Sequence, residues 1–306
     1  MTRAGRPPVV VLGPTASGKS DVAMAAAVAA PGTEIIAVDA MQVYRGMDIG
    51  TAKPTAADRA AVPHHGLDLV DPGEPFTVAD YRSAYASAAD AIAARGGRPL
   101  LVAGTGLYLT AVIDDLDLPG RYPATRVELD AEADLAALVE RLHRLDPAAA
   151  ARIEPGNRRR IERALEVTLG SGRPFSSFGP GVGAFPTTDA VLLGLRWPRV
   201  RLAERIEQRV HRMIDAGLLG EVVALAARPG GLSRTAAQAL GYKELLEHVH
   251  GVVTLDVAVD TIVRRTRQFA VRQERWFRRD PRIRWFDIDR DPVAEVAPAV
   301  VEALRA

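Results

Sequence analysis

The 306-residue chain contains no cysteine, and only three of its 39 basic residues are lysines. The missing cysteine excludes disulfides, thiolate zinc sites and a cysteine nucleophile, and it is compatible with a reducing compartment. No apolar run approaches the roughly 18 residues that a membrane span needs. The first apolar run, Val9 to Leu12, is also too short for a signal-peptide core. We therefore expect a soluble, cytoplasmic protein with no membrane partner, long enough for two domains. A monomer is also expected, although none of these absences bears on the oligomeric state.

A glycine-rich loop follows the first apolar run. Gly13-Pro-Thr-Ala-Ser-Gly-Lys-Ser20 has the spacing of a phosphate-binding P-loop, and residues 21–30 have the alanine-rich composition of a helix. Between a strand and a helix, the backbone N–H groups of such a loop bind phosphate oxygens, and Lys19 reaches the terminal phosphoryl group. The Ser20 hydroxyl is the expected ligand of a Mg²⁺ cofactor, with Asp39 as a second candidate. The loop predicts a phosphorylated ligand without identifying the rest of that molecule.

Polar residues follow two further buried-strand patterns, Glu34 to Val38 and Arg98 to Ala103. Asp39 comes directly after the first, at the sheet edge where open α/β folds bind ligands. Its carboxylate is placed either for chemistry or for capping a helix. Thr105 follows the second strand in a Gly-Thr-Gly turn and can reach the same ligand. The shorter run Leu67 to Val70 is interpreted as an edge strand.

The middle of the chain has no strand pattern. Residues 126–145 and 157–169 are predicted to be helices, and Val191 to Leu195 restores a strand that a long helix over 201–219 follows. The sequence therefore predicts a P-loop NTPase-like parallel α/β sheet flanked by helices, formed by residues 1–118 and 190–306. An inserted helical domain is predicted over 119–189.

Basic charge is concentrated near the C-terminus. Ten arginines and only four acidic residues lie between Arg264 and Arg290. Five aromatic residues are interleaved with them: Phe269, Trp276, Phe277, Trp285 and Phe286. Arginines bind phosphates and aromatic rings stack on unpaired bases, so this composition favours an RNA partner. The alternative is that the rings lie in the core and the arginines are merely solvated.

Several blocks of the sequence together resemble the tRNA dimethylallyltransferases, in family order and over nearly the whole chain. The most specific is Asp-Ala-Met-Gln-Val-Tyr-Arg-Gly-Met-Asp-Ile-Gly-Thr-Ala-Lys-Pro at 39–54. The others are the P-loop at 13–20, Gly-Thr-Gly-Leu-Tyr at 104–108, Asn-Arg-Arg-Arg-Ile-Glu-Arg-Ala-Leu-Glu-Val at 157–167, Arg-Ile-Glu-Gln-Arg at 205–209 and Gln-Ala-Leu-Gly-Tyr-Lys-Glu at 238–244. The likeness is closest to the bacterial type. Three residues depart from the family pattern: Ala40 stands in place of the usual Ser, Ala103 in place of a common Gly, and Val271 in place of the usual Lys.

The resemblance implies a reaction. Such enzymes transfer a dimethylallyl group from dimethylallyl diphosphate to N6 of the adenosine 3′ of the anticodon in tRNA, using Mg²⁺ and releasing pyrophosphate. Asp39 would take the proton from N6, and Thr105 would contact the amine or the bridging oxygen. By the same likeness, the diphosphate is bound by Gly13, Thr15, Ala16, Ser17, Gly18, Lys19, Ser20 and Arg209.

The resemblance also implies that the partner is the tRNA anticodon stem-loop, held partly by the inserted domain. Its contacts would come from the loop after the second strand, the helical domain and the C-terminal region. They are Asp39, Ala40, Met41, Gln42, Thr105, Arg126, Arg159, Arg160, Ile161, Glu162, Arg163, Gln238, Gly241, Tyr242, Lys243, Arg267, Gln268, Arg272 and Gln273.

Other functions are compatible with parts of the sequence. A P-loop, an acidic residue and Mg²⁺ would also serve a small-molecule kinase or a prenyltransferase that acts on free adenine nucleotides. An RNA-binding NTPase switch without covalent chemistry would combine the same loop with the basic C-terminal region. The Arg/aromatic stretch argues against the small substrates, and the switch requires triphosphate turnover.

Overall fold

The computed structural model describes residues 6–179 and 181–306. The chain divides into two compact units, Met1–Ile113 with Thr187–Ala306, and Asp114–Pro186. The corresponding sequence predictions are 1–118 with 190–306, and 119–189. Residues 1–5 of the first predicted domain and Pro180 of the second lie outside the described residues. Among the described helices, none combines the length and the apolar character that crossing a membrane requires.

The first unit is built on a six-stranded sheet in the order β3-β2-β4-β1-β5-β6, in which every neighbouring pair is parallel. The predicted parallel α/β sheet is therefore confirmed. β1 lies near the middle, between β4 and β5, so the P-loop that follows it opens at the centre of the sheet edge. The strands are β1 (Val9–Leu12), β2 (Thr33–Val38), β3 (His64–His65), β4 (Arg98–Ala103), β5 (Val191–Arg196) and β6 (Arg284–Asp287).

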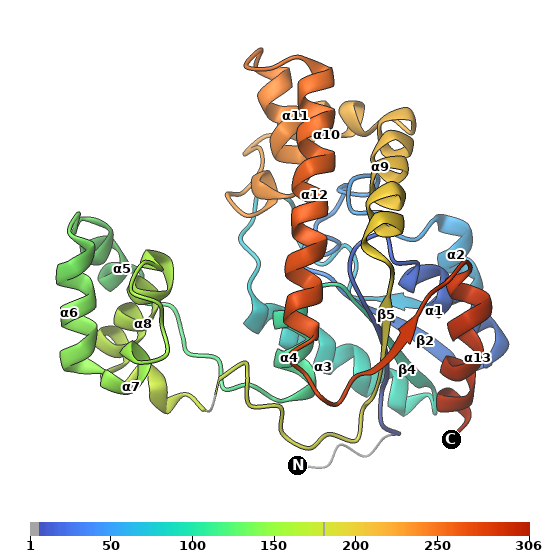
Figure 1. Cartoon of the computed structure of the whole chain (residues 1–306), viewed down its shortest axis with the longest axis horizontal. Coiled ribbons are helices and arrows are strands. Elements are labelled where there is room, and N and C mark those ends of the chain that lie inside the picture. Colours follow the sequence, from blue (N-terminus) through green and yellow to red (C-terminus); the bar gives the residue numbers. More distant parts are fainter. Residues whose placement is uncertain (1–5, 180) are drawn as a thin grey trace. The chain divides into compact units, whose positions relative to one another are not determined.

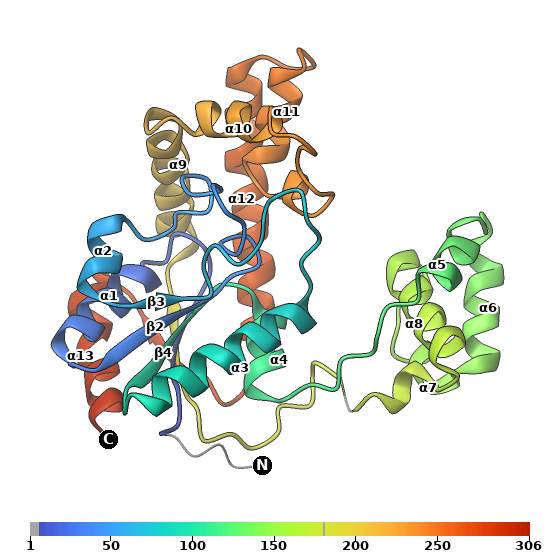
Figure 2. The same cartoon turned by 180° about the vertical axis from the view of Figure 1, so that it is seen from behind.

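Helices cover both faces of the sheet, because alternate residues of each strand point to opposite sides. Val10 and Leu12 of β1 belong to one hydrophobic core, and Val9 and Val11 belong to the other. Figures 1 and 2 show α1 (Lys19–Ala29) and α13 (Pro292–Arg305) on one face, with α3 (Val78–Ala94) and α4 (Gly106–Ile113) on the other. The long helix α12 (Leu255–Phe277) contributes Ala258, Ile262 and Phe277 to the α3 side.

Two sequence predictions for this unit are wrong. The helix expected over 201–219 is two helices, α9 (Arg199–Asp215) and α10 (Leu218–Ala226), because Gly217 takes φ +97° between them. The strand expected at Leu67 to Val70 is absent from the described sheet: Asp68 adopts a left-handed φ of +54°, and Val70 forms only an isolated bridge to Tyr44. The remaining elements of this unit are α2 (Ala56–Ala61), η2 (Ala236–Gln238) and α11 (Tyr242–Val249).

The second unit is helical. The single helix expected over 126–145 is interrupted: α5 ends at Asp130, and Asp134 caps the next helix by accepting a hydrogen bond from Ala136 N at 2.8 Å. Leu138, Leu142 and Leu165 pack in the core of the unit. Its helices are α5 (Pro123–Asp130), α6 (Leu135–Leu145), α7 (Pro147–Ala150) and α8 (Arg158–Ser171), with the short 3₁₀ turn η1 (Phe175–Ser177) after them.

Candidate active site

Three loops of the first unit meet at the carboxyl edge of the sheet. They are the P-loop after β1, residues 39–54 after β2 (the Asp39 segment), and the Gly104–Thr105 turn after β4. These strands are neighbours in the order β2-β4-β1, and backbone hydrogen bonds continue past their ends. Gly13 N donates to Ala103 O, and Gly104 N and Thr105 N both donate to Val38 O, each at 3.3 Å. The fold thus brings the phosphate loop, Asp39 and Thr105 together.

Asp39 is held in one orientation by its own segment. Its Oδ1 accepts hydrogen bonds from Met41 N at 2.8 Å and Gln42 N at 3.3 Å. Its Oδ2 faces the turn after β4: a Cβ placed on Gly104 would lie 3.5 Å from Asp39 Oδ2 and 3.4 Å from Lys19 Cε. One carboxylate oxygen is therefore used for positioning, and the other lies beside the P-loop lysine.

Thr105 connects the turn after β4 to the Asp39 segment. Its Oγ1 accepts a hydrogen bond from Ala40 N at 3.1 Å, which fixes the hydroxyl next to the Asp39 segment. A hydroxyl that accepts one bond still has its own proton to donate. Gln42 stabilises the same segment further along, because its side-chain amide donates to the carbonyls of Thr51 and Ala52 at 3.0 and 3.2 Å.

The P-loop has the backbone conformation that anion binding requires. Gly18 caps α1 with φ +90°, and a Cβ there would lie 2.6 Å from Cγ of Pro292 in α13, so only glycine fits. The N-terminus of the eleven-residue helix α1 points its free N–H groups toward the loop. Lys19 Nζ donates to Pro14 O at 3.2 Å across the loop. The predicted phosphate-binding residues thus form one cradle.

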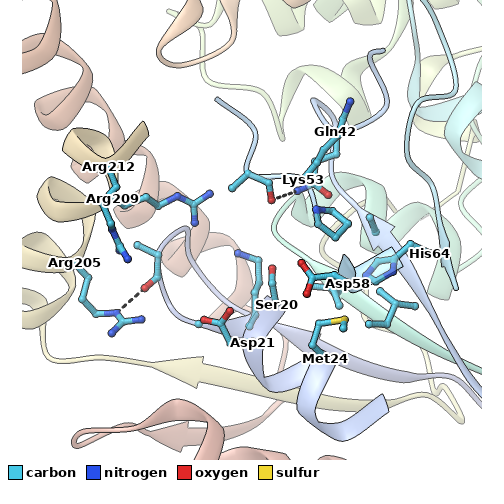
Figure 3. A pocket seen from close by; sticks show the side chains of 18 of the residues that line it. Ser20, Asp21, Met24, Gln42, Lys53, Asp58, His64, Arg205, Arg209 and Arg212 are labelled. Carbon is cyan, nitrogen blue, oxygen red and sulfur yellow. Dashed lines mark hydrogen bonds between the residues drawn. The ribbon is translucent and has the colours of Figure 1, made fainter. Parts of the chain in front are cut away.

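A cavity of about 330 Å³ opens beside this cradle. Figure 3 shows Ser20 and Asp21 of α1 in its centre, the arginines of α9 on one side, and Gln42, Lys53 and His64 on the other. The α9 residues recur at helical spacing and therefore share one face of the helix. They are Arg205, Gln208, Arg209 and Arg212, of which the sequence prediction included only Arg209.

Positive charge dominates the P-loop side of the cavity. Burial and the neighbouring Arg209 guanidinium lower the pKa of Lys19 to about 8, although the carboxylates of Asp39 and Asp21 act in the opposite direction. Burial also lowers the pKa of Arg209. Two cations held this close to each other disfavour their own charges until an anion neutralises them. The arrangement therefore favours a ligand with several negative charges.

Residues far along the chain hold the P-loop in place, a role that the sequence did not predict for them. Trp197 Nε1 donates to Ser17 O at 2.9 Å, and Arg205 Nε donates to Ala16 O at 2.8 Å while its guanidinium lies 4.5 Å above the Trp197 ring. Gln273 accepts a hydrogen bond from Thr15 N at 2.9 Å. Arg205 belongs to the block at 205–209 that resembles the family, and this membership was the only indication in the sequence of a functional role. No local pattern distinguishes Trp197.

The segment after Asp39 is stabilised from inside by a buried lysine. The Lys53 side chain is 1 % exposed, and its ammonium contacts Tyr44 O at 2.6 Å, Asp48 Oδ1 at 2.7 Å and Asp68 Oδ1 at 2.5 Å. Three acceptors around one ammonium match its three protons. Lys53 therefore closes the segment on itself.

The same segment is also held from outside, by Glu221 of α10. The Glu221 carboxylate accepts from Asp48 N, Ile49 N and Gly50 N at 3.0, 2.7 and 3.3 Å. It also accepts from the Tyr242 hydroxyl at 2.5 Å. The predicted tRNA contact Tyr242 is thus fully buried, and its side chain supports the segment. Its neighbours Gln238 and Lys243 are exposed and part-exposed, respectively, whereas Gly241 is buried.

The predicted tRNA contacts of the helical unit divide into buried and exposed residues. Ile161 lies in the core, and Glu162 is buried between Arg126, at 2.5 Å, and Arg158, at 2.6 Å. Arg163 pairs with Glu166 at 2.8 Å and donates to the carbonyls of residues 119 and 120. Arg159 and Arg160 are exposed on α8. The side chains of this last pair are placed for an external partner.

On α12, three of the four predicted tRNA contacts are exposed: Arg267, Gln268 and Arg272. Arg267 pairs with Glu207 of α9 at 2.7 Å, and the Arg272 guanidinium lies 5.8 Å from the Phe269 ring. The fourth, Gln273, is buried.

Some aromatic residues of the stretch between Arg264 and Arg290 lie in the core, and others lie near the surface beneath arginines. Phe277 is a core residue, whereas Trp276 and Phe286 are part-buried beneath Arg279 and Arg284, whose guanidiniums lie 4.4 and 4.9 Å from the ring centres.

The oxygen atoms around Lys19 are those that could take part in binding a metal. Within residues 6–179 and 181–306, no cluster of three or more His, Cys, Asp or Glu side chains forms a metal site. Ser20, Asp21 and Asp39 supply only oxygen donors. Mg²⁺ retains several waters and is typically bound by one or two carboxylates together with substrate phosphates. This donor set therefore fits Mg²⁺ that binds with a phosphorylated substrate, and it does not fit a metal held by protein alone.

Comparisons with known proteins agree with this geometry. Residues 42–280 match the family model described as IPP transferase. The chain is 48 % identical to a tRNA dimethylallyltransferase of Kineococcus radiotolerans, over 97 % of this chain and 96 % of the relative. The crystal structure of a tRNA isopentenylpyrophosphate transferase from Bacillus halodurans is similar, with 38 % identity, a TM-score of 0.70, and coverage of 98 % of this chain and 97 % of that one. A eukaryotic dimethylallyltransferase that acts on tRNA shares the fold, with a TM-score of 0.79 at 24 % identity, over 96 % of this chain and 78 % of that one.

Proposed function

The chain belongs to the IPP transferase family of enzymes, and we propose that it transfers a dimethylallyl group from dimethylallyl diphosphate to N6 of the adenosine 3′ of the anticodon in tRNA. The observation that carries this proposal is the convergence of Asp39 Oδ2 and Lys19 on the Gly104 turn. A carboxylate base and a phosphate-binding ammonium then lie on either side of one small space.

The diphosphate half of the site neutralises the leaving group. The P-loop N–H groups other than that of Thr15, which donates to Gln273, bind the diphosphate together with Lys19. Arg209 adds a second cation from α9. As the bond between C1 of the dimethylallyl group and the bridging oxygen breaks, its electron pair passes to the departing pyrophosphate. Fixed donors aimed at that developing charge stabilise the transition state more than the ground state.

The acceptor half supplies the proton acceptor. N6 of the adenine attacks C1, and the proton that N6 loses passes to Asp39 Oδ2, the carboxylate oxygen not used by the N–H groups of Met41 and Gln42. The Thr105 proton can be donated to the bridging oxygen or directed at the amine, since Oγ1 already accepts from Ala40 N. The adenine must leave the stack of the anticodon loop to reach this space, which costs less in a loop than in a duplex.

We propose Mg²⁺ as the cofactor, which the Ser20 hydroxyl would hold together with the bound diphosphate. Asp39, the second candidate ligand from the sequence, is kept for the proton, because its Oδ1 is already used by Met41 N and Gln42 N. When bound, the ion supplies further neutralisation of the diphosphate charge. Ser20 is exposed at the start of α1 and borders the cavity, so its hydroxyl is available to such a ligand.

The anticodon stem-loop is bound by exposed arginines. Arg159 and Arg160 of the helical unit, and Arg267 and Arg272 of α12, present guanidiniums that can contact RNA phosphates. A kinase or a free-nucleotide prenyltransferase would have no use for these surfaces. Gln268 and Lys243 belong to the same proposed contact set.

Incubation with unmodified tRNA, Mg²⁺ and dimethylallyl diphosphate tests the proposal. We expect one adenosine to gain a five-carbon unit, measured by mass spectrometry of the digested nucleosides, together with one pyrophosphate released per product. Parallel reactions contain AMP in place of tRNA, or ATP in place of the diphosphate. Prenylated AMP, or ATP turnover without a modified nucleoside, would instead favour the nucleotide prenyltransferase or the NTPase.

A further inference from the structure

One buried glutamine bridges the two halves of the site. The Gln273 residue, on α12, is 7 % exposed, and both ends of its amide are used. Oε1 accepts a hydrogen bond from Thr15 N at 2.9 Å, and Nε2 donates to Gly104 O at 2.8 Å. The first partner is in the P-loop after β1, and the second is in the turn after β4.

These partners are backbone atoms of the loops between which the reaction takes place. A Cβ on Gly104 would lie 3.4 Å from both Gln273 Nε2 and Lys19 Cε, and 3.5 Å from Asp39 Oδ2. The Gln273 amide is therefore next to both charged groups of the site. Thr15 N is occupied by the bridge, so this P-loop N–H donates to protein and not to a phosphate.

We propose that Gln273 is a positioning residue, which fixes the distance between the diphosphate-binding P-loop and the turn that carries Thr105. This proposal rests on the proposed prenyl transfer. It replaces the tRNA contact that the family resemblance implied for this side chain, since the amide has no exposed face for RNA comparable to that of Gln268 on the same helix.

The chemistry of the bridge explains the residue type. The position requires one acceptor for Thr15 N and one donor for Gly104 O at the same time, which a neutral amide supplies. An ionised glutamate of the same length would place a second acceptor against Gly104 O. Asparagine is one methylene shorter and cannot span both loops from the same backbone.

The test compares Gln273→Glu and Gln273→Met with the wild-type chain. Met keeps the approximate volume and removes both hydrogen bonds without adding charge. Because misplacing reacting groups by about 1 Å can cost 10²-fold, we expect single-turnover rates at saturating substrates to fall roughly 10–100-fold in both variants. The dissociation constant for tRNA should stay within about two-fold, since no RNA contact is lost. Asp260→Asn, an exposed position on the same helix, is the matched control and should retain the wild-type rate.

A pH profile separates positioning from general damage. The carboxylic acid introduced by Gln273→Glu, once protonated, again has one donor and one acceptor. The wild-type rate divided by the Gln273→Glu rate should therefore fall toward 1 at low pH. The ratio for Gln273→Met should stay constant. Lys19 and Asp39 are the charged groups beside the same turn, so Gln273→Met, which adds no charge next to them, is the reference for the Gln273→Glu profile. Thermal unfolding shows whether each variant is folded. If one variant is not folded, the rate of the other variant tests the proposal.

Two results would overturn the inference. One is a single-turnover rate within about two-fold of wild type in either folded variant. The other is a loss of rate seen only at subsaturating tRNA, with a raised dissociation constant for tRNA, which would return Gln273 to the tRNA interface. Failure of the proposed function is distinguishable, since it would appear as no dimethylallyl transfer by the wild-type chain.

Discussion

The lowered pKa of Lys19 predicts that pyrophosphate binding weakens above neutral pH. The pKa is about 8 because of burial and the adjacent Arg209, against an ordinary lysine value of 10.5. At pH 7 about 90 % of Lys19 is then protonated in the free enzyme, and at pH 9 about 10 %. If binding requires the ammonium, affinity should fall roughly ten-fold between these pH values. A lysine with its ordinary pKa would stay charged and show no such fall.

Calorimetric titration of the tRNA-free protein with Mg-pyrophosphate measures this effect. Uptake of about half a proton is expected at pH 8, because an anion raises the pKa of Lys19 when it binds. Lys19→Met gives the background, including the ionisation of pyrophosphate itself. His64 also borders the cavity, and burial lowers its pKa, which favours its neutral form.

The same pKa shift predicts that the folded protein becomes more stable as the pH rises, whereas its affinity for pyrophosphate falls. The folded pKa of Lys19 lies below its unfolded value, so the ammonium destabilises the free enzyme at and below about pH 8. That cost declines as the pH rises from about 8 toward 10.5. The free energy of unfolding of wild type, relative to Lys19→Met, should therefore increase over the range in which affinity decreases. Affinity that stays constant to about pH 10, or that falls equally in Lys19→Met, would refute the assignment.

Three further predictions concern the base, the RNA contacts and the Asp39 segment. Asp39→Ala should lower the single-turnover rate by about 10²–10⁴-fold with tRNA affinity within a few-fold, and an unchanged rate would remove Asp39 from the mechanism. The tRNA affinity should fall steeply with salt, and the double substitution Arg159→Ala, Arg160→Ala should reduce the log–log slope by about 1–2; binding that does not respond to salt would contradict the contacts. Lys53→Arg should lower the free energy of unfolding by about 1–3 kcal/mol in denaturant titrations, because the larger guanidinium cannot fit among three acceptors that surround an ammonium at 2.5–2.7 Å; wild-type stability would show that the segment can expand.

Local sequence pattern was sufficient for the centre of the fold. The strands Val9–Leu12 and Arg98–Ala103 have the bounds that the sequence predicts, because each ends in an apolar run that glycine follows directly. The break at Gly217 was missed because helical periodicity continues on both sides of it, while the left-handed φ that ends α9 leaves no periodic signal. Strand ends at one edge of a parallel sheet were enough to bring Asp39, Thr105 and the P-loop together.

The contacts that hold the site were beyond local pattern. Gln273 and Thr15 are 258 positions apart, and Trp197 contacts Ser17 across 180 positions. Neither composition nor spacing near either residue encodes such a contact. For Gln273, family resemblance predicted an external role, whereas its burial and its two backbone partners indicate an internal one.

The scarcity of lysine becomes physically meaningful at two of its three positions. Lys19 lies inside a glycine-capped loop where its Cε is 3.4 Å from where a Gly104 Cβ would stand, so a planar guanidinium has little space. Lys53 is 1 % exposed, and its ammonium is surrounded by three acceptors, on Tyr44, Asp48 and Asp68. A compact charge with three protons meets both requirements, and arginine meets neither. Arginine predominates elsewhere, but Lys243 is part-exposed and shows no comparable constraint. The requirement for lysine therefore comes from the limited space around Lys19 in the P-loop and around Lys53 in the Asp39 segment. It is independent of the positive charge that exposed arginines offer to RNA.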